Sequence, residues 1–497
     1  MRWLALACCL LGQAGLAAPL FEDRSDALPH HVYQGGWTHF VGGGVAVFDC
    51  NGDDLPDIFA AGGEAPAALI VNEGDFRFRQ AAVPEIRDVT GAYPIDLDAD
   101  GLVDLFVLRA GQNIILEGRG DCSFAMGTGP FELPKSDAWS TAFSAWWEED
   151  RQMPVLAIGN YVDREDPDGP FGACDDNEIL WPGPSGYASQ RLSPGFCALS
   201  LLAAEDARGR LSLRLSNDLH YYVKGGFEQM WDIADRRFLS VEDGWQKVAL
   251  WGMGIASRDL TGDGRDEVML TSMGDQLMQI AQGDGTYRAA PYSIGTYAQR
   301  PHTGGDGRPS TGWHAEFGDV DNDGLADLFI AKGNVDQMPG MATRDPNNLL
   351  MQQPDGTFAE AGAEAGVASL HRSRGAALAD FDQDGRLDLV VSNRRAPLEL
   401  YRNVTPGTGN WVRVNLLQAG ANRDAIGARL TLTAGPARQS VQRVVGGGHA
   451  SGQLLPLHFG LGDADGAVLS VTWPDGALST HEVSAGRTVQ IKKPKAE

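Results

Sequence analysis

Residues 319–327 read Asp319-Val320-Asp321-Asn322-Asp323-Gly324-Leu325-Ala326-Asp327 and lead into the apolar run Leu328-Phe329-Ile330-Ala331. Side-chain oxygens stand at loop positions 1, 3, 5 and 9, an alternation that can surround a hard cation such as calcium. Gly324 supplies the sharp turn, because glycine adopts positive φ without a Cβ clash. An EF-hand would carry a glutamate at position 12 and an exiting helix, whereas Ile330 stands there in a predicted strand.

The same spacing recurs four more times, each time ahead of an apolar strand. The carbonyl of the position-7 residue is the expected backbone ligand in each loop. The predicted metal ligands are Asp49, Asn51, Asp53, Leu55 and Asp57; Asp96, Asp98, Asp100, Leu102 and Asp104; Asp259, Thr261, Asp263, Arg265 and Glu267; Asp319, Asp321, Asp323, Leu325 and Asp327; and Asp380, Asp382, Asp384, Arg386 and Asp388. Loops in such regular phase predict calcium as the cofactor at about five sites, against the alternative of chance acidic turns.

The spacing of the loops predicts the architecture. Two degenerate units, near residues 144–158 and 204–215, fill the long gap after the second loop, and the period is then roughly 47–61 residues. Units of this length with about four strands each predict an all-β fold, a seven-bladed β-propeller over residues 37–404. An open β-solenoid is the alternative, less favoured because a closed ring protects strand edges. No structure is predicted for residues 19–36.

The pattern changes after residue 404, where a Gly/Pro linker precedes short alternating strands. These predict a small all-β domain over residues 410–492. Strands are expected at residues 411–416, 428–432, 440–445, 468–473 and 488–491. The run Gly446-Gly447-Gly448-His449 is expected to form a flexible turn.

The acidic units resemble FG-GAP/VCBS repeats, the calcium-loop blades of the integrin α-chain type, and the C-terminal segment resembles the ASPIC/UnbV domain. The matching C-terminal stretches are Asn410-Trp411-Val412-Arg413-Val414, Asn422-Arg423-Asp424-Ala425-Ile426-Gly427-Ala428-Arg429, His458-Phe459-Gly460-Leu461-Gly462 and Trp473-Pro474-Asp475-Gly476. Together they are similar to the cartilage acidic protein family. The resemblance implies a seven-bladed propeller with calcium in its blade loops. The third and fourth units have lost loop acids, so weak or no ion binding is expected there.

The N-terminus and the cysteines indicate the compartment. Residues 1–18 have a basic start, an apolar run and small residues, as a secretory signal peptide does. No later stretch is apolar enough to predict a transmembrane segment. Four cysteines remain, and we expect Cys50–Cys122 and Cys174–Cys197 disulfides, with free buried thiols as the alternative. The chain is therefore expected to be exported, periplasmic or extracellular, and monomeric.

Two functions agree with this sequence. The first is a binding or adhesion-type module for an unidentified protein or glycan, with structural calcium. A nucleic-acid partner is not expected, because the formal charge is −26. The alternative is an enzyme, perhaps acting on saccharides, with its site at the centre of the propeller. Its candidate residues are His39, His314, His371 and Arg374, and His314 stands where other units have glycine.

Overall fold

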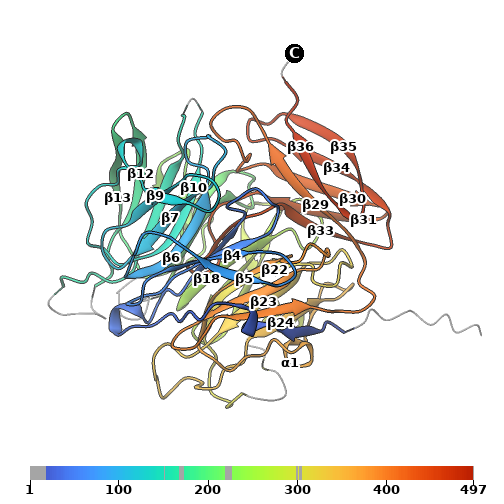
Figure 1. Ribbon diagram of the computed structural model, residues 1–497, viewed down its shortest axis with the longest axis horizontal. Helices are drawn as coiled ribbons and strands as arrows, with labels where there is room; N and C mark the ends of the chain where they lie inside the picture. Colours follow the sequence, from blue (N-terminus) through green and yellow to red (C-terminus); the bar gives the residue numbers. More distant parts are fainter. Residues whose placement is uncertain are drawn as a thin grey trace, which may run out of the picture.

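The computed structural model describes residues 18–149, 151–166, 173–218, 226–297, 300 and 305–495. These residues form β-strands joined by turns, with one short helix, α1 (Gly362–Ala365), and a few 3₁₀ turns (Figure 1). The predicted all-β class is confirmed. Among the described helices, none has the length and apolar character needed to cross a membrane. The predicted signal peptide falls on residues 1–17, outside the described part, and on Ala18.

Seven four-stranded antiparallel units follow one another along the described chain. The first three contain β2 (Val45–Phe48), β3 (Asp57–Ala60), β4 (Ala68–Asn72) and β5 (Phe78–Ala81); β6 (Val89–Ile95), β7 (Asp104–Arg109), β8 (Ile114–Gly118) and β9 (Phe124–Met126); and β10 (Ser140–Trp146), β11 (Val155–Asn160), β12 (Asn177–Gly183) and β13 (Gly186–Leu192). The next three contain β14 (Ala198–Glu205), β15 (Leu211–Asn217), β16 (Gln229–Asp232) and β17 (Arg237–Phe238); β18 (Gly252–Arg258), β19 (Glu267–Ser272), β20 (Leu277–Ala281) and β21 (Tyr287–Ala289); and β22 (Gly312–Gly318), β23 (Asp327–Lys332), β24 (Asn348–Gln352) and β25 (Phe358–Glu360). The last combines β26 (Ser373–Ala379), β27 (Asp388–Asn393) and β28 (Glu399–Asn403) with β1 (Phe21–Asp23).

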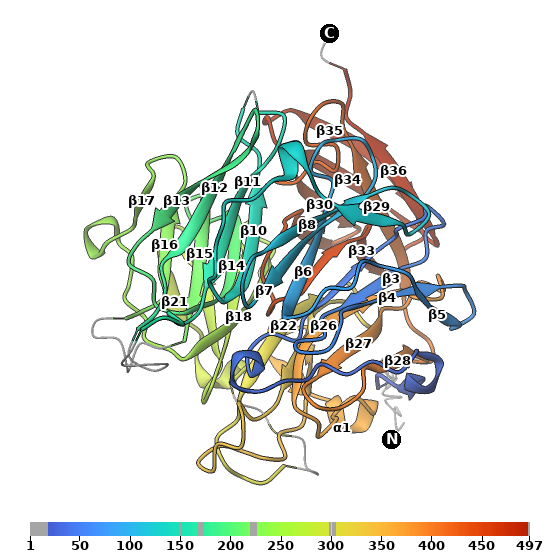
Figure 2. The ribbon, with the colours of Figure 1, turned by 60° about the vertical axis from the view of Figure 1, so that its left-hand side comes forward.

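The sheets close into a propeller. The first strand of each sheet contacts the first strand of the next, as β6, β10, β14, β18, β22 and β26 do (Figure 2). Strand β26 in turn contacts β2, which closes the ring. Strand β1 pairs antiparallel with β28, so the N-terminal segment supplies the outer strand of the last sheet. The sequence predicted no structure for residues 19–36, and the strand at Phe21–Asp23 lies within them. The pairing locks the two ends of the ring together, which an open solenoid would not do.

Each sheet is covered on both faces by its neighbours, and this explains the apolar runs in the sequence. Phe48 of β2 packs with Leu105 of the second sheet. Val47, which points to the opposite face of β2, packs with Val390 of the last sheet. A strand between two neighbouring sheets is therefore apolar at successive positions instead of alternating with polar residues.

The C-terminal domain contains two sheets around one core. The strands are β29 (Asn410–Leu417), β33 (Leu457–Gly462) and β36 (Arg487–Lys492) in one sheet, and β31 (Ala437–Gln442), β30 (Arg429–Ala434), β34 (Gly466–Thr472) and β35 (Leu478–Ser484) in the other. Val412, Leu430, Phe459 and Trp473 are buried between them. The strand predicted at residues 440–445 ends at Gln442, and the sequence did not predict β33 or β35.

Residues 443–456 leave this domain between β31 and β33 and run into the centre of the propeller. We call this segment the central plug. Within it, β32 (Gly452–Leu454) pairs parallel with β2. Further bridges join the plug to the inner strands of other sheets, among them Val445 to Ala145 and Gly448 to Ile255. The predicted flexible turn at residues 446–449 is therefore wrong, because these residues are held inside the ring.

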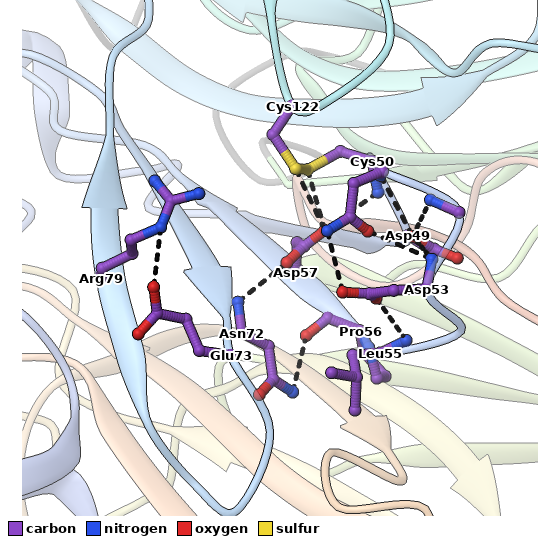
Figure 3. The surroundings of a disulfide bond; sticks show 12 residues. Asp49, Cys50, Asp53, Leu55, Pro56, Asp57, Asn72, Glu73, Arg79 and Cys122 are labelled. Atoms are coloured by element: carbon purple, nitrogen blue, oxygen red, sulfur yellow. Dashed lines mark hydrogen bonds and ion pairs between the residues drawn. A yellow bond between two sulfur atoms is a disulfide. The ribbon is translucent and has the colours of Figure 1, made fainter.

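Two disulfides are formed as predicted. Cys50–Cys122 joins the loop after β2 to the hairpin between β8 and β9, linking neighbouring sheets (Figure 3). Cys174–Cys197 spans the insertion ahead of β14.

Glycine at the inner-strand positions is required by the close approach of the plug. A Cβ on Gly44 would overlap the backbone carbonyl oxygen of Ala450. We expect Gly44→Ala to destabilise the protein by about 1–3 kcal/mol. The matched control is Gly283→Ala, because nothing lies within 4 Å of a Cβ there. Thermal unfolding of both variants measures the difference, and equal melting temperatures would contradict this account.

Candidate metal centres beneath the C-terminal domain

The loop between β22 and β23 gathers three buried carboxylates. Oxygen atoms of Asp319, Asp321 and Asp327 lie within 4.8 Å of one another. Oδ1 of Asp321 is buried and has no hydrogen-bond partner among the described residues. No described basic side chain forms an ion pair with these acids. Buried anionic oxygens without a counter-charge are unfavourable, and this arrangement fits a cation with oxygen ligands.

Hydrogen bonds from the backbone give the loop its shape. The Asp319 carboxylate accepts the N–H groups of Asp323 at 3.1 Å and Gly324 at 2.8 Å. Asp323 in turn accepts the N–H of Leu325 at 2.7 Å. The corresponding bond, from position 7 to position 5, is present in all five loops. The structure thus brings together positions 1, 3 and 9 here, and uses position 5 to hold the turn.

Two other loops gather the same three positions. The groups are Asp96, Asp98 and Asp104, and Asp380, Asp382 and Asp388. Each contains a buried carboxylate oxygen without a hydrogen-bond partner, on Asp96 and on Asp382.

The loop at 380–388 differs because arginines already surround it. The partners are Arg413 with Asp380 at 3.1 Å, Arg402 with Asp382 at 2.6 Å, and Arg386 with Asp384. These guanidinium groups compensate part of the negative charge that a cation would otherwise compensate. The acids at 319–327 form no such ion pair among the described residues, so a bound cation would compensate more negative charge there than at 380–388.

The loops at 49–57 and 259–267 do not gather three carboxylates in the described structure. In the first, an oxygen of Asp57 lies 2.8 Å from Sγ of Cys50, beside the disulfide (Figure 3). Disulfide sulfurs are not thiolates, so this group is not a thiolate metal site. In the second, Arg265 pairs with Asp263 at 3.0 Å, while Oε1 of Glu267 is buried without a hydrogen-bond partner. The predicted ligands Asn51, Leu55 and Thr261 belong to these less compact loops.

Burial and mutual repulsion raise the carboxyl pKa values in the loops. Burial, with the neighbouring Asp323, raises the pKa of Asp321 to about 6. Burial raises the pKa values of Asp96 and Asp104 to about 7, with nearby carboxylates adding to the effect. The pKa values of Asp319 and Asp327 lie well above the ordinary range for the same reasons. Without a cation, the folded loops therefore bind protons in its place.

The C-terminal domain rests directly on the loop at 319–327. The N–H of Gly462 donates to the carbonyl of Asn322 at 2.8 Å, and the His458 ring is 2.7 Å from Oδ1 of Asn322. Gly460 faces the Asp319 carboxylate so closely that a Cβ would overlap it. The stretch His458–Gly462, which served as a family marker in the sequence, is therefore part of the docking surface.

The domain also approaches the loop at 96–104. Asp424 adds its charge to those that raise the pKa of Asp96, and the Arg423 guanidinium lies against Gly101. The stretch that begins at Asn422 thus contacts a second acidic loop. Sequence reasoning missed both contacts, although the glycines in these stretches mark places where backbones meet closely.

The four candidate catalytic residues do not converge. Three histidines each lie near a different carboxylate: His39 is 3.4 Å from Asp88, His314 is 3.3 Å from Glu316, and His371 is 3.7 Å from Glu399. Arg374 is buried, donates to the carbonyls of Phe40, Asn334 and Val335, and lies over the Trp313 ring. No hydrogen bond, ion pair or ring contact joins any two of the four in the part of the chain that the structure describes.

His314 instead fixes the plug. Its Nδ1 accepts the N–H of His449 at 3.1 Å, so Nε2 carries the proton and faces Glu316. The Glu316 carboxylate also accepts Nε2–H of Gln453 in the plug at 2.6 Å. His314, which stands where other units have glycine, thus accepts a hydrogen bond from the plug backbone.

Two family models match the sequence. The FG-GAP-like repeat matches residues 49–107 and 259–330, and ASPIC and UnbV matches residues 418–497. The chain contains FG-GAP-like repeats and an ASPIC and UnbV domain. The predicted resemblance is confirmed. The matched residues include four of the five acidic loops and most of the C-terminal domain.

The curated relatives are cartilage acidic proteins. The chain is 28% identical to cartilage acidic protein 1 of Homo sapiens over 172 residues, which is 34% of this chain and 26% of that protein. It is 34% identical to cartilage acidic protein 1 of Xenopus tropicalis over 119 residues, 23% of this chain and 18% of that protein. The matched part spans about a quarter or less of the length of these relatives.

Solved structures resemble the chain at low identity. BBS1N in complex with ARL6DN is 10% identical, with a TM-score of 0.47, covering 79% of this chain and 98% of that one. YCF48 bound to D1 peptide is also 10% identical, with a TM-score of 0.42, covering 79% and 99%. The assignment of a propeller rests on the sheet order and ring closure, not on these likenesses.

The raised pKa values predict an unusual pH dependence in metal-free protein. The folded loops keep protons up to about pH 6–7, whereas unfolded aspartates lose them near pH 4. Stability from these groups is full below the unfolded pKa and is lost as pH rises through the folded pKa. Thermal unfolding in a chelator should therefore show a lower melting temperature at about pH 8 than at about pH 6.

Calcium provides the control for this measurement. With calcium in excess, the decline between about pH 6 and pH 8 should shrink or disappear, because the cation replaces the protons. Buried His449 and His458, whose pKa values are lowered to about 3, act in the opposite direction, because unfolded histidines release their protons near pH 6.5. The raised carboxyl pKa values are more numerous, so the net change expected between about pH 6 and pH 8 is a decline. A metal-free melting temperature that rises across this window would contradict the account.

Proposed function

We propose that this protein is an exported binding module whose acidic loops hold calcium, and that the calcium fixes the C-terminal domain on the propeller. The observation that carries this proposal is the buried triad Asp319, Asp321 and Asp327, with an unpartnered oxygen and no basic partner among the described residues. The triad lies directly beneath His458–Gly462. Its occupant therefore controls the charge at the contact between the two parts.

Calcium is the cation that this donor set favours. The three gathered groups supply only carboxylate oxygens, without the histidine or thiolate ligands that zinc or copper prefers. Calcium also accepts flexible geometry and several carboxylates. Two disulfides support an oxidising compartment, periplasmic or extracellular, where a weak calcium site can be filled.

A binding role is the function that the described structure supports best. The plug fills the centre of the ring, where the alternative of a saccharide-active enzyme places its site. The candidate histidines are separated, each beside its own carboxylate. The partner in this proposal is a protein or glycan bound on an exposed face.

A substitution at Asp321 tests the calcium proposal. Calcium at about ten times its Kd should stabilise the wild type by about 1.4 kcal/mol per site. In Asp321→Asn, one repelling charge is removed, so the metal-free melting temperature should equal or exceed that of the wild type. The increase on adding calcium should be smaller, and titration calorimetry should find fewer sites.

Asp355→Asn is the matched control, because Asp355 caps a hairpin turn by accepting from Thr357 and lies outside the acidic loops. Its calcium increment should match the wild type. The proposal fails if calcium leaves the wild-type melting temperature unchanged, or if Asp321→Asn gains as much from calcium as the wild type does.

A further inference from the structure

A cavity of about 270 Å³ lies between the inner strands of the propeller and the C-terminal domain. Strands β18, β22 and β26 form one wall. The plug and the chain that follows it to His458 form the other wall. The cavity therefore belongs to neither part alone.

Arg258, the last residue of β18, lines this cavity without a direct partner for its guanidinium among the described residues. Its exposed fraction is 9%. Its guanidinium makes no hydrogen bond and no ion pair with any residue that the structure describes, and its one aromatic contact is with the Phe459 ring, 6.0 Å from the centroid. Two other arginines line the cavity. Arg413 forms an ion pair with Asp380 at 3.1 Å, and Arg443 donates to the carbonyl of Leu455 at 2.9 Å and is attracted by Asp424.

The acids near Arg258 are engaged elsewhere. Asp266 pairs with Arg429 at 2.8 Å and accepts from Ser257. Asp259 and Asp319 belong to the acidic loops, where backbone N–H groups donate to them. Arg258 is thus attracted by these acids from a distance, without a direct partner in the described chain.

The carboxylates on the cavity wall are also engaged. Glu316 accepts from the plug's Gln453 and from the N–H of Leu378, and it faces His314. Asp380 is paired with Arg413, and Asp54 is exposed. The wall therefore offers an approaching anion one unengaged guanidinium among the described residues and no unengaged buried carboxylate.

Much of the remaining wall is apolar. The side chains of Leu202, Ile255, Leu378, Leu387 and Pro456 contribute to it. A buried guanidinium without a partner is unfavourable, and its planar fork matches a carboxylate or phosphate group. An anionic head group with an apolar body would therefore satisfy both Arg258 and the rest of the wall.

We propose that this cavity binds a small organic anion, whose carboxylate or phosphate group pairs with Arg258 while its apolar part lies between β18, β22, β26 and the plug. Because both parts of the chain contribute walls, the bound anion contacts both and stabilises their docked arrangement. This proposal does not require calcium in the loops. Of the carboxylates in the three triads, only Asp380 lines the cavity, and it is already paired with Arg413, while Arg258 makes no direct contact with any triad among the described residues.

Titration calorimetry on the full chain tests the proposal with three probes. Benzoate and phenyl phosphate carry the two head groups on the same apolar ring, and benzyl alcohol is the neutral counterpart. We expect saturable binding of at least one anion, which identifies the preferred head group, and binding of benzyl alcohol at least about tenfold weaker.

Variants assign the binding to Arg258. Arg258→Gln should weaken the anion at least about tenfold without lowering the melting temperature, because it removes a charge that has no direct partner. Arg258→Lys keeps the positive charge but loses the planar pair of N–H donors, so it should bind the anion with intermediate affinity. This variant provides the test if Arg258→Gln does not fold. The matched control is Arg288→Gln, on the exposed outer strand β21 of the same sheet, which should bind as the wild type does.

Three results would overturn the proposal. They are no saturable binding of either anion to the wild type at millimolar concentration, equal binding of benzyl alcohol, and unchanged anion affinity in both Arg258 variants.

Discussion

The close contact between the central plug and the inner strands constrains the rest of the structure. The plug is a segment of the C-terminal domain, yet it lies against strands from several sheets of the ring. Gly44, Gly91 and Gly375 have no room for a Cβ beside Ala450 or Ser451. At the corresponding place in another sheet, His314 accepts a hydrogen bond from the plug backbone. The C-terminal domain keeps an apolar core of its own, and the plug joins it to the inner strands of the propeller.

The acidic loops matter because of where this docking places them. The loop at 319–327 is pressed against Gly460, and the loop at 96–104 against Arg423. Burial by a second domain removes water from the carboxylates, and their pKa values rise accordingly. The same groups are satisfied either by protons or by a cation. Charge compensation in the loops is thus coupled to the position of the domain on the propeller, and this coupling is the basis of the structural role that we propose for calcium.

The local features were predictable from the sequence and the distant contacts were not. The spacing of Asp319, Asp321 and Asp327 is read directly from neighbouring positions, and the apolar strand that follows is equally local. Strand β1 has no such signal in Phe21–Asp23, because it forms only by pairing with β28, almost 400 residues later. The sequence predicted a flexible turn at residues 446–449 because glycines, considered without their neighbours in the fold, allow many backbone conformations. The loops at 319–327 and 380–388 have the same spacing of acids, but only the second forms an ion pair with Arg413 among the described residues. This ion pair depends on docking of the C-terminal domain, so the spacing alone does not predict it.

Hydrogen exchange of the plug, measured with calcium and with a chelator, tests the central claim most directly. If calcium in the loops fixes the domain on the propeller, backbone amides of residues 443–455 and 458–462 should be protected in calcium and exchange faster after chelation. Strands β11 and β12 flank no predicted calcium loop and form no backbone bridge with the plug among the described residues, so they should change little and serve as the internal reference. Unchanged protection of the plug after complete removal of calcium would contradict the account.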